Sequence, residues 1–138
     1  MRLLLDTCVI IDWLTDADPF ERNVWDILND PGTKLYVSAE TARELIVSFN
    51  NKKLLSKYWK TAEEMLVAMK EEAMVDILPI SERTMFTYSR LTLNEAMDHR
   101  DPSDHVIIAH AITEHLTLLS SDQKFAFYRS QGLNLIEY

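Results

Sequence analysis

Short apolar runs along the chain alternate with longer stretches in which apolar residues recur every three or four positions. The short runs predict five buried strands, the first ending at Asp6 and the others spanning residues 34–37, 75–78, 116–119 and 133–136. The longer stretches predict helices over residues 9–14, 19–29, 39–50, 54–74, 81–91, 101–115 and 123–129. Strands that alternate with helices imply right-handed crossovers, so we expect an α/β fold, a three-layer α/β/α domain around a mainly parallel central sheet.

Capping residues place the starts of several predicted helices. Asp18 and Asp101 each precede a proline and stand three residues before another acid, an arrangement typical of a helix start. Ser38 and Ser81 are favourable N-caps for the helices that follow them. The helix over residues 54–74 depends on apolar periodicity, which predicts one long amphipathic helix.

The composition bounds the class of protein. A length of 138 residues with 47% hydrophobic side chains suits a single domain, residues 1–138, around one core. Only one cysteine, Cys8, is present, and the N-terminus lacks the features of a secretory signal. Every apolar run is shorter than the roughly 18 residues of a membrane span. We therefore expect a soluble cytoplasmic protein with no membrane contact.

The charge argues against a simple nucleic-acid binder. The formal net charge is −8, whereas proteins that bind nucleic acid usually present a basic face. Either the ligand is not nucleic acid or bound cations intervene, because clustered acids act as metal ligands. The densest basic run consists of Lys52, Lys53, Lys57 and Lys60. It is either a solvated helix face or a contact for an RNA backbone.

Four acids follow the ends of predicted strands. Asp6 and Asp122 come just after strands, and Glu44 and Asp104 lie near the beginnings of helices that follow strand ends. In a parallel sheet these places share one edge, where ligands usually bind. Four carboxylates packed together stay ionised only with cations, and an all-oxygen site suits Mg²⁺ or Mn²⁺. Such a site favours phosphodiester hydrolysis.

Other groups fit this chemistry less well. Glu40 shares a helix face with Glu44 but lies in the first turn, where the helix dipole alone favours an acid, so we expect it to be structural. Cys8 has no histidine close to it in sequence, and we expect a small buried residue close to Asp6. The histidines do not form a local zinc pair and are expected to be packing or surface residues. They are His99, His105, His110 and His115.

Four segments together carry a resemblance to a known family. They are Leu-Leu-Leu-Asp6-Thr7, Val-Ser38-Ala with Glu44 downstream, Asp101-Pro-Ser-Asp104-His-Val-Ile-Ile-Ala109-His-Ala111, and Leu-Leu-Ser120-Ser-Asp122. In this order and at these intervals they resemble the PIN-domain family, and most of all its VapC-type toxins. The resemblance implies a Mg²⁺-dependent endoribonuclease that cleaves RNA, forms a homodimer and is inhibited by a small antitoxin protein.

The resemblance also implies site residues. The acidic site would consist of Asp6, Glu44, Asp104 and Asp122, which serve as metal ligands and catalytic groups, with Thr7, Asp101 and Ser120 as supporting neighbours. Three positions depart from the family pattern. Cys8 stands where the family commonly has an Asn that orients the site, and Ser103 and His105 stand where a bulky apolar residue and an Arg are usual.

Three other functions fit parts of the pattern. A phospho-receiver domain also gathers acids at strand ends, but it uses paired acids after its first strand, and Asp6 stands alone. A phosphatase with an aspartyl intermediate needs a second acid two residues after Asp6, where Cys8 stands. A catalytically silent PIN module that binds protein or RNA stays the main alternative, because of Cys8.

Overall fold

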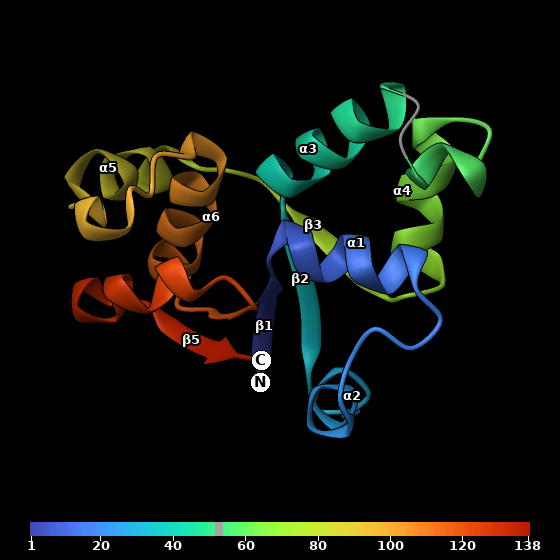
Figure 1. The fold of residues 1–138 in the computed structure, drawn as a ribbon, viewed down its shortest axis with the longest axis horizontal. Coiled ribbons are helices and arrows are strands. Elements are labelled where there is room, and N and C mark those ends of the chain that lie inside the picture. The colour runs from blue at the N-terminus through green and yellow to red at the C-terminus, as the bar shows by residue number, and fades with distance from the viewer. Residues whose placement is uncertain (52–53) are drawn as a thin grey trace.

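The computed structural model describes residues 1–51 and 54–138. Within these residues, five parallel strands form one sheet in the order β3-β2-β1-β4-β5 (Figure 1). The strands are Arg2–Leu5 (β1), Lys34–Ser38 (β2), Val75–Leu78 (β3), Thr117–Ser120 (β4) and Asn134–Glu137 (β5). The predicted parallel sheet is confirmed, and β1 lies at its centre.

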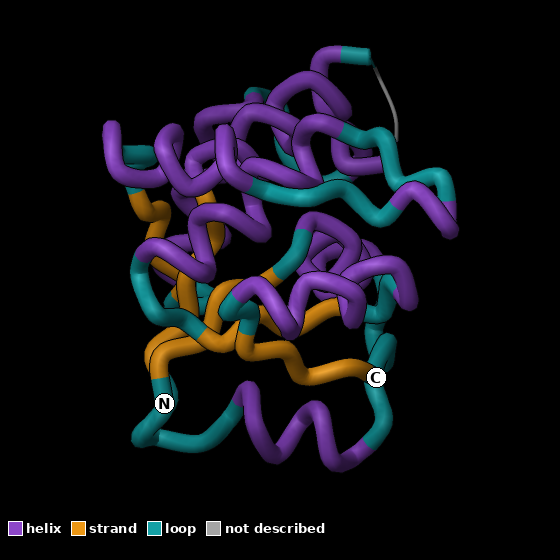
Figure 2. The backbone as a smooth tube through the Cα atoms, turned by 90° about the vertical axis from the view of Figure 1, so that its left-hand side faces the viewer, coloured by secondary structure: helices purple, strands orange, loops and turns teal. Residues whose placement is uncertain are grey.

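Helices cover both faces of the sheet, which confirms the three-layer prediction. The α-helices are Thr7–Thr15 (α1), Arg22–Leu28 (α2), Ala39–Asn50 (α3), Ala62–Glu71 (α4), Glu82–Arg90 (α5) and Pro102–Thr113 (α6). Short 3₁₀ helices span Leu54–Lys57 (η1), Glu95–Met97 (η2) and Gln123–Gln131 (η3). Figure 2 shows α2 apart from the other helices, below the sheet.

Alternation along β1 divides the core into two parts. Leu3 and Leu5 pack in a cluster with apolar residues of α1, α2, α3 and α4, whereas Leu4 packs with residues of α6 and η3. All three leucines are fully buried. Successive side chains of a strand point to opposite faces, so an apolar run without polar interruption is what a strand covered on both faces requires.

Helix caps follow directly from three strands at their carboxyl ends. The Asp6 side chain caps α1, Ser38 caps α3, and Asp122 caps η3, each accepting a backbone N–H of the first turn. Because parallel strands end at the same edge, these caps bring polar side chains together there. The cap at Asp6 also makes α1 begin at Thr7, two residues before the predicted start.

The predicted long helix over residues 54–74 is wrong. The chain forms η1, turns, and begins α4 only at Ala62. The Thr61 side chain accepts the Glu64 backbone N–H at 3.1 Å, and Glu64 accepts the Lys60 N–H at 3.0 Å. This arrangement closely resembles a capping box, so a local start signal interrupts an otherwise continuous apolar period.

The helix predicted over residues 19–29 also begins late, at Arg22, with Glu21 as its N-cap. Asp18 does not cap it, because its carboxylate accepts the Trp25 indole N–H at 3.0 Å. Phe20 is buried and packs edge-on against Trp25 and Tyr138, at 5.2 and 5.5 Å between ring centroids. Burial of Phe20 thus replaces the first helical turn that Asp18-Pro19 favoured.

Among the described residues, no helix combines the length and the apolar character that a membrane span requires.

A backbone test of the fold is available at the end of η3. Gly132 has φ of 105°, and an added Cβ would lie 3.6 Å from Ile112 Cγ2, an ordinary contact. We expect Gly132→Ala to lower the free energy of unfolding by about 1–2 kcal/mol through backbone strain alone. Urea unfolding measures this change.

The matched control is Gly32→Ala, where the glycine has no positive φ. We expect this control to change stability by about 0.5 kcal/mol or less. Equal losses in both variants would contradict the assignment of strain to Gly132.

Candidate metal centre

The predicted site acids come from four separate elements at the carboxyl edge of the sheet. Asp6 follows β1, Glu44 lies in the second turn of α3, Asp104 lies in the first turn of α6, and Asp122 follows β4. Each is an electrostatic neighbour of others in the set, since the charges of Asp6, Asp122 and Glu44 all act on Asp104. The fold therefore brings together acids that are distant in sequence.

The Asp6 carboxylate is buried and held by three donors. Its Oδ1 accepts the Thr7 N–H at 2.8 Å, and its Oδ2 accepts the Ser120 hydroxyl at 2.7 Å and the Cys8 thiol at 3.2 Å. Burial raises the pKa of Asp6 above its usual range, and the charge of Asp122 adds to the rise. These hydrogen bonds fix the orientation of the carboxylate.

Cys8 replaces the expected amide with a weaker donor. Burial, followed by the charge of Asp6, raises the pKa of the Cys8 thiol to about 11, so the group stays protonated at neutral pH. A protonated thiol donates to Asp6, as an amide N–H does, although less strongly. The substitution therefore keeps a donor beside the first acid.

Glu44 is tied to the same edge through Thr7. The Thr7 hydroxyl donates to Glu44 Oε1 at 2.6 Å and lies 3.0 Å from the Thr41 hydroxyl. Burial raises the pKa of Glu44, and the charges of Asp101, Glu40 and Asp6 raise it further. Thr7 thus links the start of α1 to α3 and orients Glu44.

Glu40 has different partners. Its Oε1 accepts hydrogen bonds from Arg43 and from the Ser103 hydroxyl, the latter at 2.6 Å. The hydrogen bond from Arg43 lowers the pKa of Glu40, in contrast to the raised pKa of Glu44. Ser103, one of the positions that departs from the family pattern, therefore joins α6 to α3 through Glu40.

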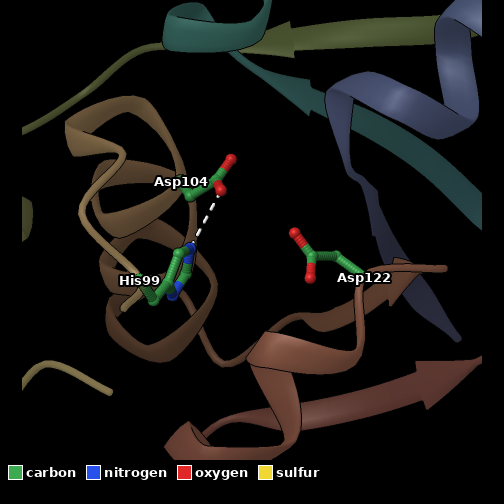
Figure 3. A group of neighbouring side chains, drawn as sticks. All are labelled: His99, Asp104 and Asp122. Carbon is green, nitrogen blue, oxygen red and sulfur yellow. Dashed lines mark hydrogen bonds and ion pairs between the residues drawn. The ribbon is translucent and has the colours of Figure 1, made fainter. Parts of the chain in front are cut away.

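Asp104 and Asp122 face each other, with His99 beside them (Figure 3). One ligand atom from each of the three residues lies within 4.8 Å of the other two. Burial, followed by the charges of Asp101, Asp6, Asp122 and Glu44, raises the pKa of Asp104 to about 8. Burial and the neighbouring carboxylates thus both oppose the ionisation of Asp104.

His99 is buried, as expected of a packing residue, but the sequence did not predict its contact with a site acid. Its Nε2 lies 2.9 Å from Asp104 Oδ2, inside the acidic centre. His99 lies in the loop before α6, five residues before Asp104, and local spacing does not predict that the two meet. His105 and His110 are buried in α6, as expected of packing residues.

The remaining predicted neighbours support the acids. Asp101 caps α6 and accepts the Ser103 N–H at 2.9 Å. Ser120 donates to Asp6 and accepts the Asp122 N–H at 3.1 Å, so one hydroxyl positions two of the acids.

The lysine run stays a prediction. Lys52 and Lys53 lie outside the described residues, and Lys57 and Lys60 are exposed near η1.

The donor set fits a hard divalent cation. The site offers carboxylate oxygens, and the charges that raise the pKa of Asp104 all belong to carboxylates. Removing a proton from such a group is unfavourable unless a cation neutralises the cluster. Oxygen-rich sites of this kind suit Mg²⁺ or Mn²⁺.

Comparison with known proteins identifies the family and the fold of the chain. Residues 3–130 match the family described as PIN domain. No curated protein matches the chain by sequence. Several solved structures resemble it over nearly its whole length, and three of them are described next.

VapBC-1 from nontypeable Haemophilus influenzae has a TM-score of 0.76 at 21% identity and covers 99% of this chain and 98% of its own. VapBC-5 from Mycobacterium tuberculosis, a member of the VapBC family of toxin-antitoxin systems, has a TM-score of 0.63 at 21% identity with the same coverage. FitAcB from Neisseria gonorrhoeae has a TM-score of 0.66 at 26% identity and covers 98% of this chain and 96% of its own. These structures share the fold.

The raised pKa of Asp104 predicts an unusual dependence of stability on pH. In the folded, metal-free protein this carboxyl binds its proton more tightly than in the unfolded chain, with a pKa of about 8 against an ordinary 3.8. The contribution of Asp104 to the free energy of unfolding is therefore most favourable at low pH, and it falls as the pH rises from about 4 to about 8.

We expect Asp104→Asn to be more stable than the wild type at pH 8 in EDTA by at least about 1 kcal/mol, or about 4 °C or more in Tm, because each unit of raised pKa corresponds to about 1.4 kcal/mol. At pH 4 the two proteins should melt alike. Adding Mn²⁺ at pH 8 should raise the Tm of the wild type more than that of the variant. If the Tm of the wild type and that of the variant depend on pH in the same way in EDTA, the raised pKa of Asp104 is contradicted.

Proposed function

We propose, from the premise that this chain belongs to the PIN domain family, that it is a metal-dependent endoribonuclease that hydrolyses RNA phosphodiester bonds. Its metal ligands and catalytic groups are Asp6, Glu44, Asp104 and Asp122. The observation that carries the proposal is the convergence of one buried and three half-buried acids from four elements, with pKa values raised at Asp6, Glu44 and Asp104. Acids whose pKa values are raised by burial and by neighbouring charges are typical of a functional site.

The site residues have two roles: the acids would bind the cation, and neighbouring hydroxyl groups orient the acids. Asp104 and Asp122 face the same space and would hold Mg²⁺ or Mn²⁺ together with Asp6 and Glu44. When bound, the divalent cation neutralises the charge of a phosphodiester and lowers the pKa of an attacking water. Thr7 and Ser120 orient Glu44 and Asp6 through short hydrogen bonds from their hydroxyls, so both carboxylates are positioned before substrate arrives.

The charge of −8 supports a role for the cation in binding RNA. A phosphodiester that approaches uncompensated carboxylates is repelled, and a bound cation reverses the local sign. The exposed Lys57 and Lys60 add positive charge at a separate position, near η1. RNA binding is therefore expected to depend on both divalent cation and these lysines.

The expected partners are a small antitoxin and a second copy of the chain. The shared fold with chains of VapBC complexes supports the first. A hollow of about 860 Å³ lined by residues that include Phe49, Tyr58 and Trp59 offers an aromatic surface for such a partner. Met85 and Phe86 on α5 are 42% and 56% exposed and offer an apolar surface for a homodimer.

The test of the catalytic proposal compares two acids from one segment. Asp104→Asn removes an anionic ligand, so we expect RNA cleavage to fall by about 100-fold or more while the fold persists. Asp101→Asn is the matched control, because Asn is an equally good N-cap, and its cleavage should stay within about threefold of the wild type. Cleavage of labelled RNA with Mg²⁺ and with EDTA, and the Tm of each protein, are measured in parallel.

Two outcomes would overturn the assignment. Normal cleavage by Asp104→Asn together with loss in a folded Asp101→Asn would show that the wrong acid of the segment was chosen. Cation binding by the wild type without cleavage of any RNA would favour the catalytically silent PIN module instead, with the weak Cys8 donor as its structural basis.

The antitoxin proposal has a separate test. A short reading frame next to the gene should encode a protein that copurifies with this chain, and adding it at equimolar concentration should suppress RNA cleavage. An unrelated small protein of similar charge serves as the control. A neighbouring protein that neither binds nor inhibits would contradict the toxin assignment without affecting the nuclease.

A further inference from the structure

The ring of His99 lies between a site acid and a buried tyrosine. Its Nε2 is 2.9 Å from Asp104 Oδ2, and its Nδ1 is 3.0 Å from the Tyr128 hydroxyl. The side chain is 1% exposed, and the ring packs edge-on against His105 at 4.7 Å between centroids. The orientation of the ring is therefore set by packing, and both nitrogens have polar partners.

The directions of these hydrogen bonds follow from proton counting. The Asn94 backbone N–H, which can only donate, donates to the Tyr128 hydroxyl oxygen at 3.1 Å. The Tyr128 hydroxyl is fully buried, and its other hydrogen-bond partner among the described residues is His99 Nδ1. The single phenolic proton therefore points at Nδ1, which must be the bare nitrogen of the ring.

A bare Nδ1 leaves the proton of the neutral ring on Nε2. The same proton count excludes a doubly protonated ring, because such a ring would also carry a proton on Nδ1. The Nε2–H then donates to Asp104 Oδ2. The hydrogen bonds run in one direction, from Asn94 to Tyr128, to His99 and to Asp104.

Asn94, where this series of hydrogen bonds begins, is also connected to a second site acid. The Asn94 side-chain amide donates to the Lys124 carbonyl at 3.1 Å, and the Lys124 backbone N–H donates to Asp122 Oδ1 at 2.9 Å. Two acids from different elements are thus braced through one set of hydrogen bonds.

We propose that His99 is a positioning residue for Asp104, with a tautomer fixed by Tyr128, and is not itself a cation ligand. This role rests on the proposed function, in which Asp104 binds the cation. One carboxylate oxygen accepts from His99, and the other is left to face the site. The position of Nε2 among the ligand atoms of Asp104 and Asp122 otherwise suggests a mixed nitrogen and oxygen site.

The ligand alternative requires a different proton arrangement. Binding a cation through Nε2 requires a bare Nε2 and a proton on Nδ1. The Tyr128 hydroxyl proton would then lose its acceptor in a fully buried position. The tautomer of His99 therefore distinguishes the two roles.

The experiment measures that tautomer by long-range ¹H–¹⁵N correlation of the histidine rings in ¹⁵N-labelled protein. A protonated and a bare ring nitrogen have well-separated ¹⁵N shifts. We expect His99 to carry its proton on Nε2 both in EDTA and with saturating Mg²⁺. A proton on Nδ1 in either state, or transfer of the proton to Nδ1 when Mg²⁺ is added, overturns the inference.

Variants give a second readout through Mn²⁺ affinity, measured by electron paramagnetic resonance. His99→Gln supplies an amide donor in place of Nε2–H and should keep affinity within about threefold, whereas His99→Ala should lose about 10- to 100-fold. If His99→Gln loses as much affinity as Asp104→Asn, His99 is a ligand. Tyr128→Phe should populate both tautomers in a folded protein, and Tm measurements check folding throughout.

Failure of this inference is separable from failure of the proposed function. Wild-type protein that binds neither Mg²⁺ nor Mn²⁺ overturns the metal centre, and with it the role of Asp104. Cation binding with the His99 proton on Nδ1 overturns the positioning role alone. Neither measurement requires RNA or cleavage.

Discussion

The carboxyl edge of the sheet depends on one constraint, the burial of the Asp6 carboxylate at the end of the central strand. A buried charge needs hydrogen-bond donors, and Asp6 has them from Thr7, Cys8 and Ser120. Thr7 begins α1 and Ser120 ends β4, so satisfying this carboxylate also fixes how the first helix leaves the sheet and how β4 ends beside β1.

The other acids are packed around Asp6 at an electrostatic cost that hydrogen bonds reduce only in part. Glu44 accepts from Thr7, and Asp104 accepts from His99, yet burial still leaves the pKa of each raised. A fold optimised for stability alone would place apolar residues here. The hydrogen bonds orient the carboxylates toward a shared space, while their remaining repulsion makes a cation favourable there.

Errors in the predicted helices came from contacts that periodicity does not report. Apolar spacing continued through residues 54–74, but Thr61 and Glu64 start a new helix by local hydrogen bonding. The cap signal at Asp18 was genuine in type, yet Trp25 took the carboxylate and Phe20 entered the core. In both places several hydrogen-bonding or packing partners were available to the same residues. The sequence shows which partners are present but not which contact forms.

The sequence by itself determined the strands, their parallel arrangement and the acids that follow their ends, because apolar runs and capping residues are local signals repeated along the chain. It also placed Cys8 beside Asp6, since only Thr7 separates them. Only the tertiary structure decided that His99 meets Asp104 and that Tyr128 orients the ring. Tyr128 is 29 residues beyond His99, and such a contact depends on how η3 packs against the loop before α6. That packing is a property of the assembled core, which no local pattern encodes.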